Sequence, residues 1–592
     1  MLKISPKCAP TPRGRLATIA LSGFITYGAI AALSDYAQAQ APRITKDTVA
    51  PYRTVPHLAA IPQIAAGVRA APHMTKPFRH RLGAAAFAAK KAAAKAMRFT
   101  PPGVIPAGRP APMGSGAHVA HPELMQQTVS PPELAFTATS DAQCAALSGF
   151  LVEPADQALA VGNTLASVVH GVNSCINLYD KNGNQQAGFP KSHNTFFGLG
   201  ALNDSDPRAI FDWINHRFLY IIISFDNSCF NQCTSAAFYN LAVSMTSDPA
   251  GSWCLYQLPV ATTPNPQPDG TFLLPDFPRL GQDREAVYIA SNLFGVDFVA
   301  EEVQALRKTD LYACNPVTRS TVTGLTDSDN FFTIQPASIF SPYDHPKSMY
   351  FVASSDNPSN QIKVSAFHDP FGTPTFTSVT VTGTNTYSLP PDATQQGGCS
   401  LIATNDQRIS NSPFYVAGSI YASLATDGGN GEPGILSYQI KPFVDTSGGP
   451  NDGKIVGATI RNEIAHFGAN GTTDAFYYPG QLPDPEGNIT TVFGTSNATS
   501  FASLAYASRR VGQAVGTEPD AGVIAGAGTA CFDGGRWGDY FAAAPAGIVS
   551  GGGTGGFPKF WFSGMMAVVG DDWSNTIGRT GYSEINQNLP ER

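Results

Sequence analysis

The sequence from residue 136 onward predicts an all-β protein, and three observations support this prediction. Paired strand patterns return about every 60–75 residues, as in Asp206–Asp212 followed by a turn and Arg217–Ser224. The segments between these copies lack the periodicity of a helix. After residue 136 the chain becomes rich in Phe, Tyr, Val, Thr, Gly and Asn, which are typical of sheets and turns. Periodic all-β units of this size are typical of a β-propeller, in which each unit is one blade.

We predict a single propeller of seven blades over residues 136–592, with six blades as the alternative and eight as a third choice. Proline residues interrupt the sixth blade and make it the least regular. The segments Trp573–Ile577 and Glu133–Thr139 are candidates for the strands that close the ring. The blades are expected at residues 158–189, 206–260, 277–322, 332–381, 399–466, 475–508 and 536–580.

Residues 1–39 have the pattern of an export signal. Basic residues precede the apolar run Leu16–Leu33, and Ala37-Gln38-Ala39 is a typical cleavage site. An uncleaved anchor is the alternative, because the apolar run is nearly long enough to span a bilayer. We therefore expect a secreted, periplasmic or cell-surface protein with no transmembrane segment once the signal is removed.

Cysteine usage agrees with export. The chain has nine cysteines, and eight remain after the signal that contains Cys8. An even number in an exported chain predicts up to four disulfides. Cys229 and Cys233 are the favoured local pair. We expect no metal site at the cysteines, because a second close pair or a histidine at ligand spacing is missing.

Residues 40–135 form a basic, Ala- and Pro-rich arm or pro-segment, which we expect to be largely disordered. Its segment His80–Phe99 has the composition of a short basic helix. The formal net charge of the whole chain is −7, so the body after the arm is acidic and will repel nucleic acid. The arm can contact a polyanion, an anionic envelope surface or the acidic body itself.

One turn gives a family resemblance. Thr246-Ser247-Asp248-Pro249-Ala250-Gly251-Ser252-Trp253 resembles the Asp-box, S-x-D-x-G-x-T-W, of sialidase-like propellers, and His368–Phe376 is a weaker copy. The resemblance implies that Asp248 accepts backbone N–H bonds, Gly251 adopts positive φ and Trp253 packs between strands. The chain thus resembles exported bacterial β-propellers of the sialidase-like group. In that group the box supports the fold away from the active site, so it implies no activity.

Four arginines are the main candidates for ligand binding. Arg208, Arg279, Arg408 and Arg536 fall on expected innermost strands, where side chains face the central channel, and an aspartate lies two or three residues from each. These Arg–Asp sets either tie neighbouring blades together or form an anion- or sugar-binding channel mouth. Phe277-Pro278-Arg279-Leu280 departs from the sialidase F-R-I-P motif, so the catalytic arginine of that family is not carried over. The catalytic residues, if any, remain unknown.

Arg536-Trp537-Gly538-Asp539-Tyr540 is the strongest local signature. Trp537 or Tyr540 can stack on a sugar with Asp539 as a hydroxyl acceptor, or Trp537 can fill the seam to the next blade. Asp327-Ser328-Asp329 and Asp427-Gly428-Gly429-Asn430 carry oxygen ligands for calcium, but neither matches the twelve-residue calcium loop. We expect no cofactor.

These observations favour a non-enzymatic, monomeric exported propeller that binds a surface glycan, peptide or partner protein at its channel mouth. The alternative is a sialidase-like glycoside hydrolase or lyase that acts on an acidic glycan through channel carboxylates and arginines. A third hypothesis is an envelope factor that binds through its basic arm.

Overall fold

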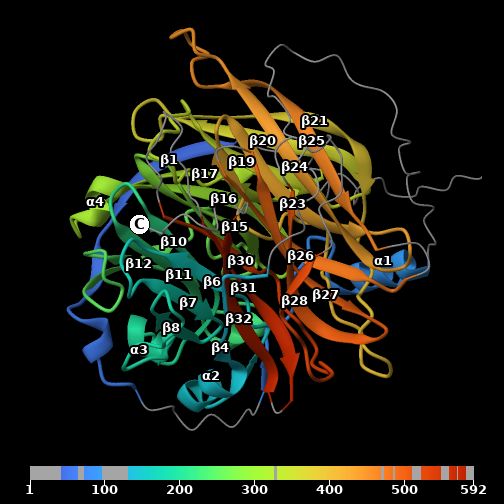
Figure 1. Ribbon diagram of the computed structural model, residues 1–592. Helices are drawn as coiled ribbons and strands as arrows, with labels where there is room; N and C mark the ends of the chain where they lie inside the picture. Colours follow the sequence, from blue (N-terminus) through green and yellow to red (C-terminus); the bar gives the residue numbers. More distant parts are fainter. Residues whose placement is uncertain are drawn as a thin grey trace, which may run out of the picture. The chain divides into compact units, whose positions relative to one another are not determined.

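Seven antiparallel sheets make up a seven-bladed β-propeller, which confirms the predicted fold class and blade number (Figure 1). The computed structural model describes residues 42–64, 73–96, 131–325, 330–468, 472–484, 487–509, 522–547, 559–569 and 571–581. The expected signal peptide lies outside these described residues.

Blades one to four each follow the chain from the innermost strand outward. The first contains β6 (Ala158–Val161), β7 (Val168–Val172), β8 (Cys175–Tyr179) and β9 (Lys191–Ser192). The second contains β10 (Asn203–Asp212), β11 (Arg217–Phe225), β12 (Phe238–Ser244) and β13 (Trp253–Pro259). The third contains β14 (Leu274–Gln282), β15 (Ala286–Phe294), β16 (Phe298–Arg307) and β17 (Val317–Leu325). The fourth contains β18 (Phe331–Pro336), β19 (Met349–Ser355), β20 (Ser359–His368) and β21 (Thr375–Tyr387).

The last three blades complete the ring. The fifth contains β22 (Phe414–Val416), β23 (Ser419–Asp427), β24 (Pro433–Val444) and β25 (Ile455–His466). The sixth contains β26 (Ala475–Pro483), β27 (Ile489–Asn497), β28 (Ser500–Arg509) and β29 (Val523–Gly526). The seventh contains β30 (Ala542–Ala546), β31 (Lys559–Val568), β32 (Asp571–Gly581) and β4 (Leu134–Ser140).

A strand from the beginning of the propeller closes the ring, as predicted. β4 pairs antiparallel with β32, with Phe136 opposite Ile577 in the register (Figure 1). Trp573 is fully buried beside this seam, and its indole N–H donates to the Val152 carbonyl at 3.1 Å. The innermost strand β30 contacts β6 of the first blade. Closure covers the faces of the first and last blades that an open ring would expose.

The blades pack through apolar strands that are buried on both faces. β11 (RFLYIIISF) and β15 (AVYIASNLF) are buried along nearly their whole length. Continuous apolar runs of this kind are expected where neighbouring blades cover both faces of a sheet. The hydrophobic core is therefore a series of layers between blades.

Short helices and one small sheet lie outside the blades. They are η1 (Leu58–Ala60), α1 (Ala84–Ala96), α2 (Asp141–Ser148), α3 (His193–Phe197), η3 (Asn227–Phe230) and α4 (Lys308–Tyr312). β3 (His73–Thr75) pairs in parallel with β5 (Leu151–Glu153). In the described part of the chain, no helix combines the length and apolar character that crossing a membrane requires.

Four disulfides join the eight cysteines from Cys144 onward. The local pair Cys229–Cys233 is formed, as predicted. The other three bonds join residues more distant in the sequence: Cys144–Cys175, Cys254–Cys314 and Cys399–Cys531.

The described parts of the N-terminal arm differ from the expected disorder. β1 (Arg43–Val49) pairs with the outer strand β17 of blade three, and β2 (Pro51–Val55) pairs with the outer strand β13 of blade two. Both blades thereby gain a fifth strand, because the arm fills backbone donors and acceptors at their edges. α1 lies within the segment where a short basic helix was expected.

The turn that resembles an Asp-box has part of the expected geometry. Asp248 accepts the Ala250 N–H at 2.9 Å, and Trp253 is buried with its indole N–H on the Pro249 carbonyl. Gly251 does not adopt the positive φ that the resemblance implied. A Cβ added at this position would lie 3.3 Å from the Asp248 carbonyl oxygen, which is a tight contact.

Candidate functional site at the channel mouth

A repeated irregularity shapes the start of the innermost strands. In blades two, three, four and six the ladder register shifts at this point, as between Ser205 and Arg208. A left-handed residue with φ between 45° and 62° lies in or before the innermost strand of six blades. Each such residue costs about 1–3 kcal/mol, and strain of this kind clusters at functional sites. These residues are Asp156, Asp206, Phe277, Thr333, Asn405 and Tyr478.

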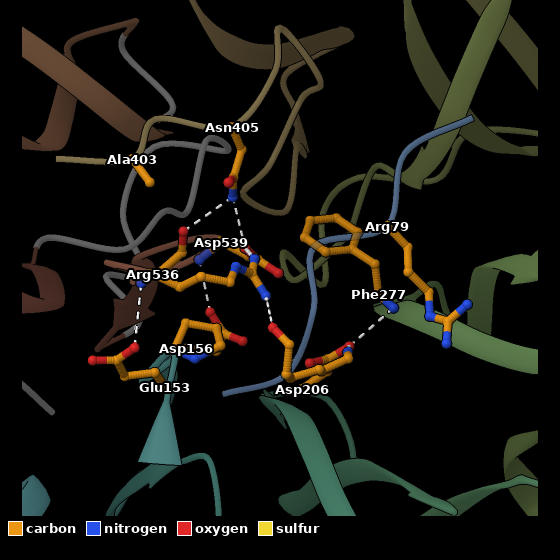
Figure 2. A network of polar contacts seen from close by, with 12 residues as sticks. Arg79, Glu153, Asp156, Asp206, Phe277, Ala403, Asn405, Arg536 and Asp539 are labelled. Carbon is orange, nitrogen blue, oxygen red and sulfur yellow. Dashed lines mark hydrogen bonds and ion pairs between the residues drawn. The ribbon is translucent and has the colours of Figure 1, made fainter. Parts of the chain in front are cut away.

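Charged side chains near the start of several innermost strands, together with Glu153 of β5, lie close to one another at one end of the channel. We call this group the channel mouth, and Figure 2 labels its members Glu153, Asp156, Asp206, Arg536 and Asp539. All of its members are buried. Asp206 links the second blade to the third, because its Oδ2 accepts the Phe277 N–H at 3.0 Å. The channel mouth consists of Glu153, Asp156, Asp206, Asp276, Asp406, Arg408, Arg536 and Asp539.

Part of the arm occupies this mouth. Residues Thr75–His80, named here the mouth segment, contact side chains of several blades. The Lys76 ammonium lies 2.5 Å from Asp206 Oδ2 and 2.6 Å from Asp276 Oδ1. Burial acts to lower the pKa of Lys76, but the two carboxylates outweigh burial and raise it. Lys76 therefore remains a fully charged cation inside the propeller.

The main chain of the mouth segment is also bound. The Lys76 N–H donates to the Glu153 carbonyl at 2.8 Å, which continues the parallel pairing of β3 with β5. Arg536 donates to the Lys76 carbonyl at 2.8 Å, and Arg408 lies 3.5 Å from the Arg79 carbonyl. The body thus holds this segment as an extended peptide, through backbone groups as well as side chains.

Phe78 and His80 also contact side chains of the propeller. The Phe78 ring lies 4.9 Å from the Arg408 guanidinium carbon and 5.3 Å from that of Arg536. His80 packs on Phe332, and its Nδ1 accepts the Leu82 N–H at 3.1 Å. An accepting Nδ1 is unprotonated, so the ring is neutral. Burial lowers the pKa of His80 to about 4, in agreement with this geometry.

The predicted arginines divide into two groups. Arg408 and Arg536 contact the mouth segment, and each also binds an aspartate, Asp406 at 2.6 Å and Asp539 respectively. Arg208 and Arg279 tie blades together. Arg208 donates to the Pro278 carbonyl at 3.2 Å, and Arg279 donates to the Ile334 carbonyl at 2.9 Å.

The aromatic candidates are packed rather than open. Trp537 is fully buried and meets Phe532 edge to face, with 4.8 Å between ring centroids. Tyr540 stacks under Arg208 and donates to the Pro207 carbonyl at 2.9 Å. Asp539 accepts from Asn405 at 2.6 Å as well as from Arg536. In this arrangement neither ring has a face free for a sugar.

The buried carboxylates have opposite pKa shifts. Burial, with the nearby charges of Asp539 and Asp206, raises the pKa of Asp156 well above its usual range. Burial also raises the pKa of Asp539. Burial would raise the pKa of Asp206 too, but Lys76 and hydrogen bonds lower it. The mouth therefore holds the Lys76 cation against an ionised Asp206.

Below the mouth the channel is narrow. Gln157, Arg208 and Asn411 line a cavity of about 30 Å³, and a neighbouring cavity of about 30 Å³ lies between the innermost strands around Ile210 and Phe340. Each of these two cavities has room for about one water molecule.

Neither calcium candidate gains support as a metal site. Asp427 caps its own turn by accepting the Gly429 N–H at 2.8 Å. Asp327-Ser328-Asp329 falls outside the described residues. Among the residues that the structure describes, no cluster of His, Cys, Asp or Glu has the geometry of a metal site.

Sequence reasoning missed the residues of the arm and of the chain just before the first blade. Lys76, Phe78 and His80 lie in a segment interpreted as a linker, and Glu153 and Asp156 precede the first expected strand. The available signal was charge. The arm is basic and the body is acidic, and contact with the acidic body was one of three expected partners for the arm.

Comparison with known proteins adds no functional assignment. No family model and no curated protein matches the chain. Three solved structures illustrate the weak similarity found. A Trypanosoma rangeli sialidase with 2,3-difluorosialic acid is 10% identical (TM-score 0.31; 69% of this chain and 56% of that one). A protein of unknown function from Dyadobacter fermentans is 12% identical (TM-score 0.31; 64% and 95%). A family 117 glycoside hydrolase from Zobellia galactanivorans is 15% identical (TM-score 0.27; 67% and 91%).

Proposed function

We propose that this protein is a non-enzymatic binding propeller that recognises an extended polypeptide at its channel mouth. One observation carries the proposal: the mouth already holds a peptide segment through both backbone groups and side chains. The Lys76 N–H and carbonyl are bound by Glu153 and Arg536, and the Lys76 ammonium is bound by two carboxylates. Addition of a peptide strand to an exposed β edge is a recurring recognition mode.

The alternative, a glycoside hydrolase or lyase, has one feature in its favour. Asp156 and Asp206 have opposite pKa shifts, a pattern that often separates an acid from a base. However, Asp156 accepts the Asp539 N–H at 2.7 Å, and Asp206 binds both Lys76 and the Phe277 N–H. The chain itself occupies these oxygens, so we favour binding over hydrolysis.

The proposal can be tested by emptying the mouth. In a mouth-open variant, residues 75–80 are replaced by alternating glycine and serine, while β1, β2 and α1 remain. Isothermal titration with a capped synthetic peptide of residues 73–83 should give saturable one-to-one binding. Absence of binding to a folded mouth-open variant would reject the proposal, and so would turnover of sialyl or other acidic oligosaccharides by that variant.

The native chain provides a second readout if the mouth-open variant does not fold. An excess of the same peptide should increase amide hydrogen exchange of residues 75–80, because peptide in trans competes with the mouth segment in cis. A scrambled peptide of the same composition is the control. If the two peptides had equal effects, recognition at the mouth would be excluded.

A further inference from the structure

The next inference rests on the proposed polypeptide-binding function and specifies what the polypeptide must carry. We infer that the channel mouth recognises the tripeptide lysine–proline–aromatic, and that Lys76-Pro77-Phe78 of the arm is a cis occupant of that site. A polypeptide that carries the same tripeptide displaces the arm in trans. Each of the three positions has its own physical requirement.

The first position requires a lysine. Asp206 and Asp276 come from neighbouring blades and converge on one ammonium at 2.5 and 2.6 Å, with all three groups buried. Without a cation, both buried carboxylates would lose the ion-pair partner that they share. A compact ammonium with three donors can sit between two converging carboxylates, whereas the planar guanidinium of arginine needs a wider, side-by-side arrangement.

The second position requires a residue that holds the lysine extended without adding a buried donor. A residue before proline is restricted to the extended region, which matches the strand-like pairing of Lys76 with Glu153. Proline also has no N–H, so position 77 brings no further donor into the mouth. Pro77 itself is exposed, so its ring is not what the mouth contacts.

The third position requires an aromatic ring. Phe78 lies within about 5 Å of two guanidinium groups, those of Arg408 and Arg536, as the centroid distances of 4.9 and 5.3 Å show. Both arginines are already paired with Asp406 and Asp539, so they face the ring in fixed orientations. Cation–π contacts of this kind favour an aromatic side chain over an aliphatic one.

The same tripeptide occurs a second time in this chain. Lys441-Pro442-Phe443 lies near the end of β24, and the Phe443 ring is 40% exposed. The pairing of β24 with β23 ends at Ile440, so residues 441–443 are paired only with β25 on their other side. Lys441 is partly exposed and Phe443 is exposed, whereas Pro442 is buried, so a second copy of the chain offers the lysine and the aromatic side chain at its surface. Another polypeptide is the other possible source.

Peptide variants test the inference on the mouth-open variant. Relative to the parent peptide 73–83, Lys76→Met should weaken binding by about 100-fold or more, since it leaves a buried carboxylate pair without its cation. Lys76→Arg should weaken it by about 10-fold, and Phe78→Ala by about 3- to 30-fold. Leu82→Ala in the peptide is the control and should bind like the parent.

The protein side has a matched pair of variants. Asp276→Asn in the mouth should reduce the preference for the parent peptide over the Lys76→Met peptide, because the amide has no charge to offer the ammonium. Asp248→Asn makes the same change in an exposed turn of the second blade and should leave the preference unchanged. If all peptides bind equally, tripeptide recognition is overturned while polypeptide binding stands; if none binds, both proposals fall.

Two further measurements test whether a peptide displaces the mouth segment and which polypeptide supplies the competing tripeptide. In the native chain, the parent peptide should raise hydrogen exchange of residues 75–80, and unchanged exchange at saturating peptide would overturn displacement. Light scattering of the mouth-open variant over a concentration series distinguishes the sources. Self-association that Lys441→Met abolishes would assign the tripeptide to a second copy, and a monomer at every concentration would assign it to another polypeptide.

Discussion

Replacing Arg279 with methionine is expected to destabilise the whole propeller without opening the mouth. The Arg279 guanidinium is fully buried. It donates to the Ile334 and Phe277 carbonyls at 2.9 Å each, and it lies 3.2 Å from Glu301 Oε1. Ile334 belongs to the fourth blade, so this one side chain joins two blades. Methionine has a similar volume but leaves Glu301 buried without its cation.

The size of the effect follows from the loss of this partner. Breaking a buried ion pair from one side costs about 3–5 kcal/mol. Unfolding entropy is about 2.1 cal/mol/K per residue, so a cooperative body of roughly 450 residues has about 1 kcal/mol/K. The expected decrease in Tm is therefore about 3–5 °C. Burial lowers the pKa of Arg279 to about 10, so the side chain stays charged at neutral pH.

Calorimetry of Arg279→Met, with peptide titration after the mouth is opened, checks this prediction. Arg461→Met is the matched control, since Arg461 is exposed on β25 and should leave Tm unchanged. Arg279→Lys should recover only part of the loss, because lysine cannot bind all the same acceptors. A Tm within about 1 °C of the parent together with lost peptide binding would refute the structural role and favour a ligand-binding one.

Three further predictions concern the arm and the ring. The mouth segment should detach more readily as pH falls from 6.5 to 4, because docked His80 has a pKa of about 4 and a released histidine titrates near 6.5. The docked state should lose about 3 kcal/mol of stability over this range, and His80→Phe should flatten the pH profile of hydrogen exchange at residues 75–80. Trp573→Ala at the closing seam should cost about 3–5 kcal/mol, measured as a lower Tm, whereas Tyr52→Ala on the exposed arm should cost far less. Removing Cys399–Cys531 with a double serine variant should cost about 2–5 kcal/mol in denaturant unfolding, and an unchanged midpoint would contradict this.

Much of the fold could be predicted because its signals are local. Strand pairs such as β10 and β11 are joined by a tight turn, and their alternating or fully apolar patterns are readable in the sequence. The closing pair of β4 with β32 was also accessible, since a ring requires its two ends to meet. Pro479 and Pro483 lie within β26 without preventing the sixth blade from forming.

The occupied mouth could not be predicted, because its contacts are distant in the sequence. Lys76 and Asp206 are 130 residues apart, and nothing near Lys76 marks it as buried. An Ala- and Pro-rich basic stretch has no hydrophobic period, so it resembles a linker until the body supplies its partners. The convergence of Arg408, Arg536 and Asp539 was accessible, because all three fall on expected innermost strands whose side chains face the channel. The segment of the arm that fills the space between them could not be predicted from the sequence.

The ion pairs that hold the arm on the propeller differ in strength. Away from the mouth, Arg81 pairs at 2.6 Å with Asp356, which is buried, whereas Lys91 pairs with Asp392, whose side chain is 35% exposed. Ion pairs open to solvent contribute about 0–1 kcal/mol each and weaken with salt. Lys76 is enclosed by two carboxylates, and its loss would leave both buried. Within residues 75–80 the charge contacts therefore centre on Lys76, so a ligand that takes over the two carboxylates should release this segment while β1 and β2 stay paired with their blades.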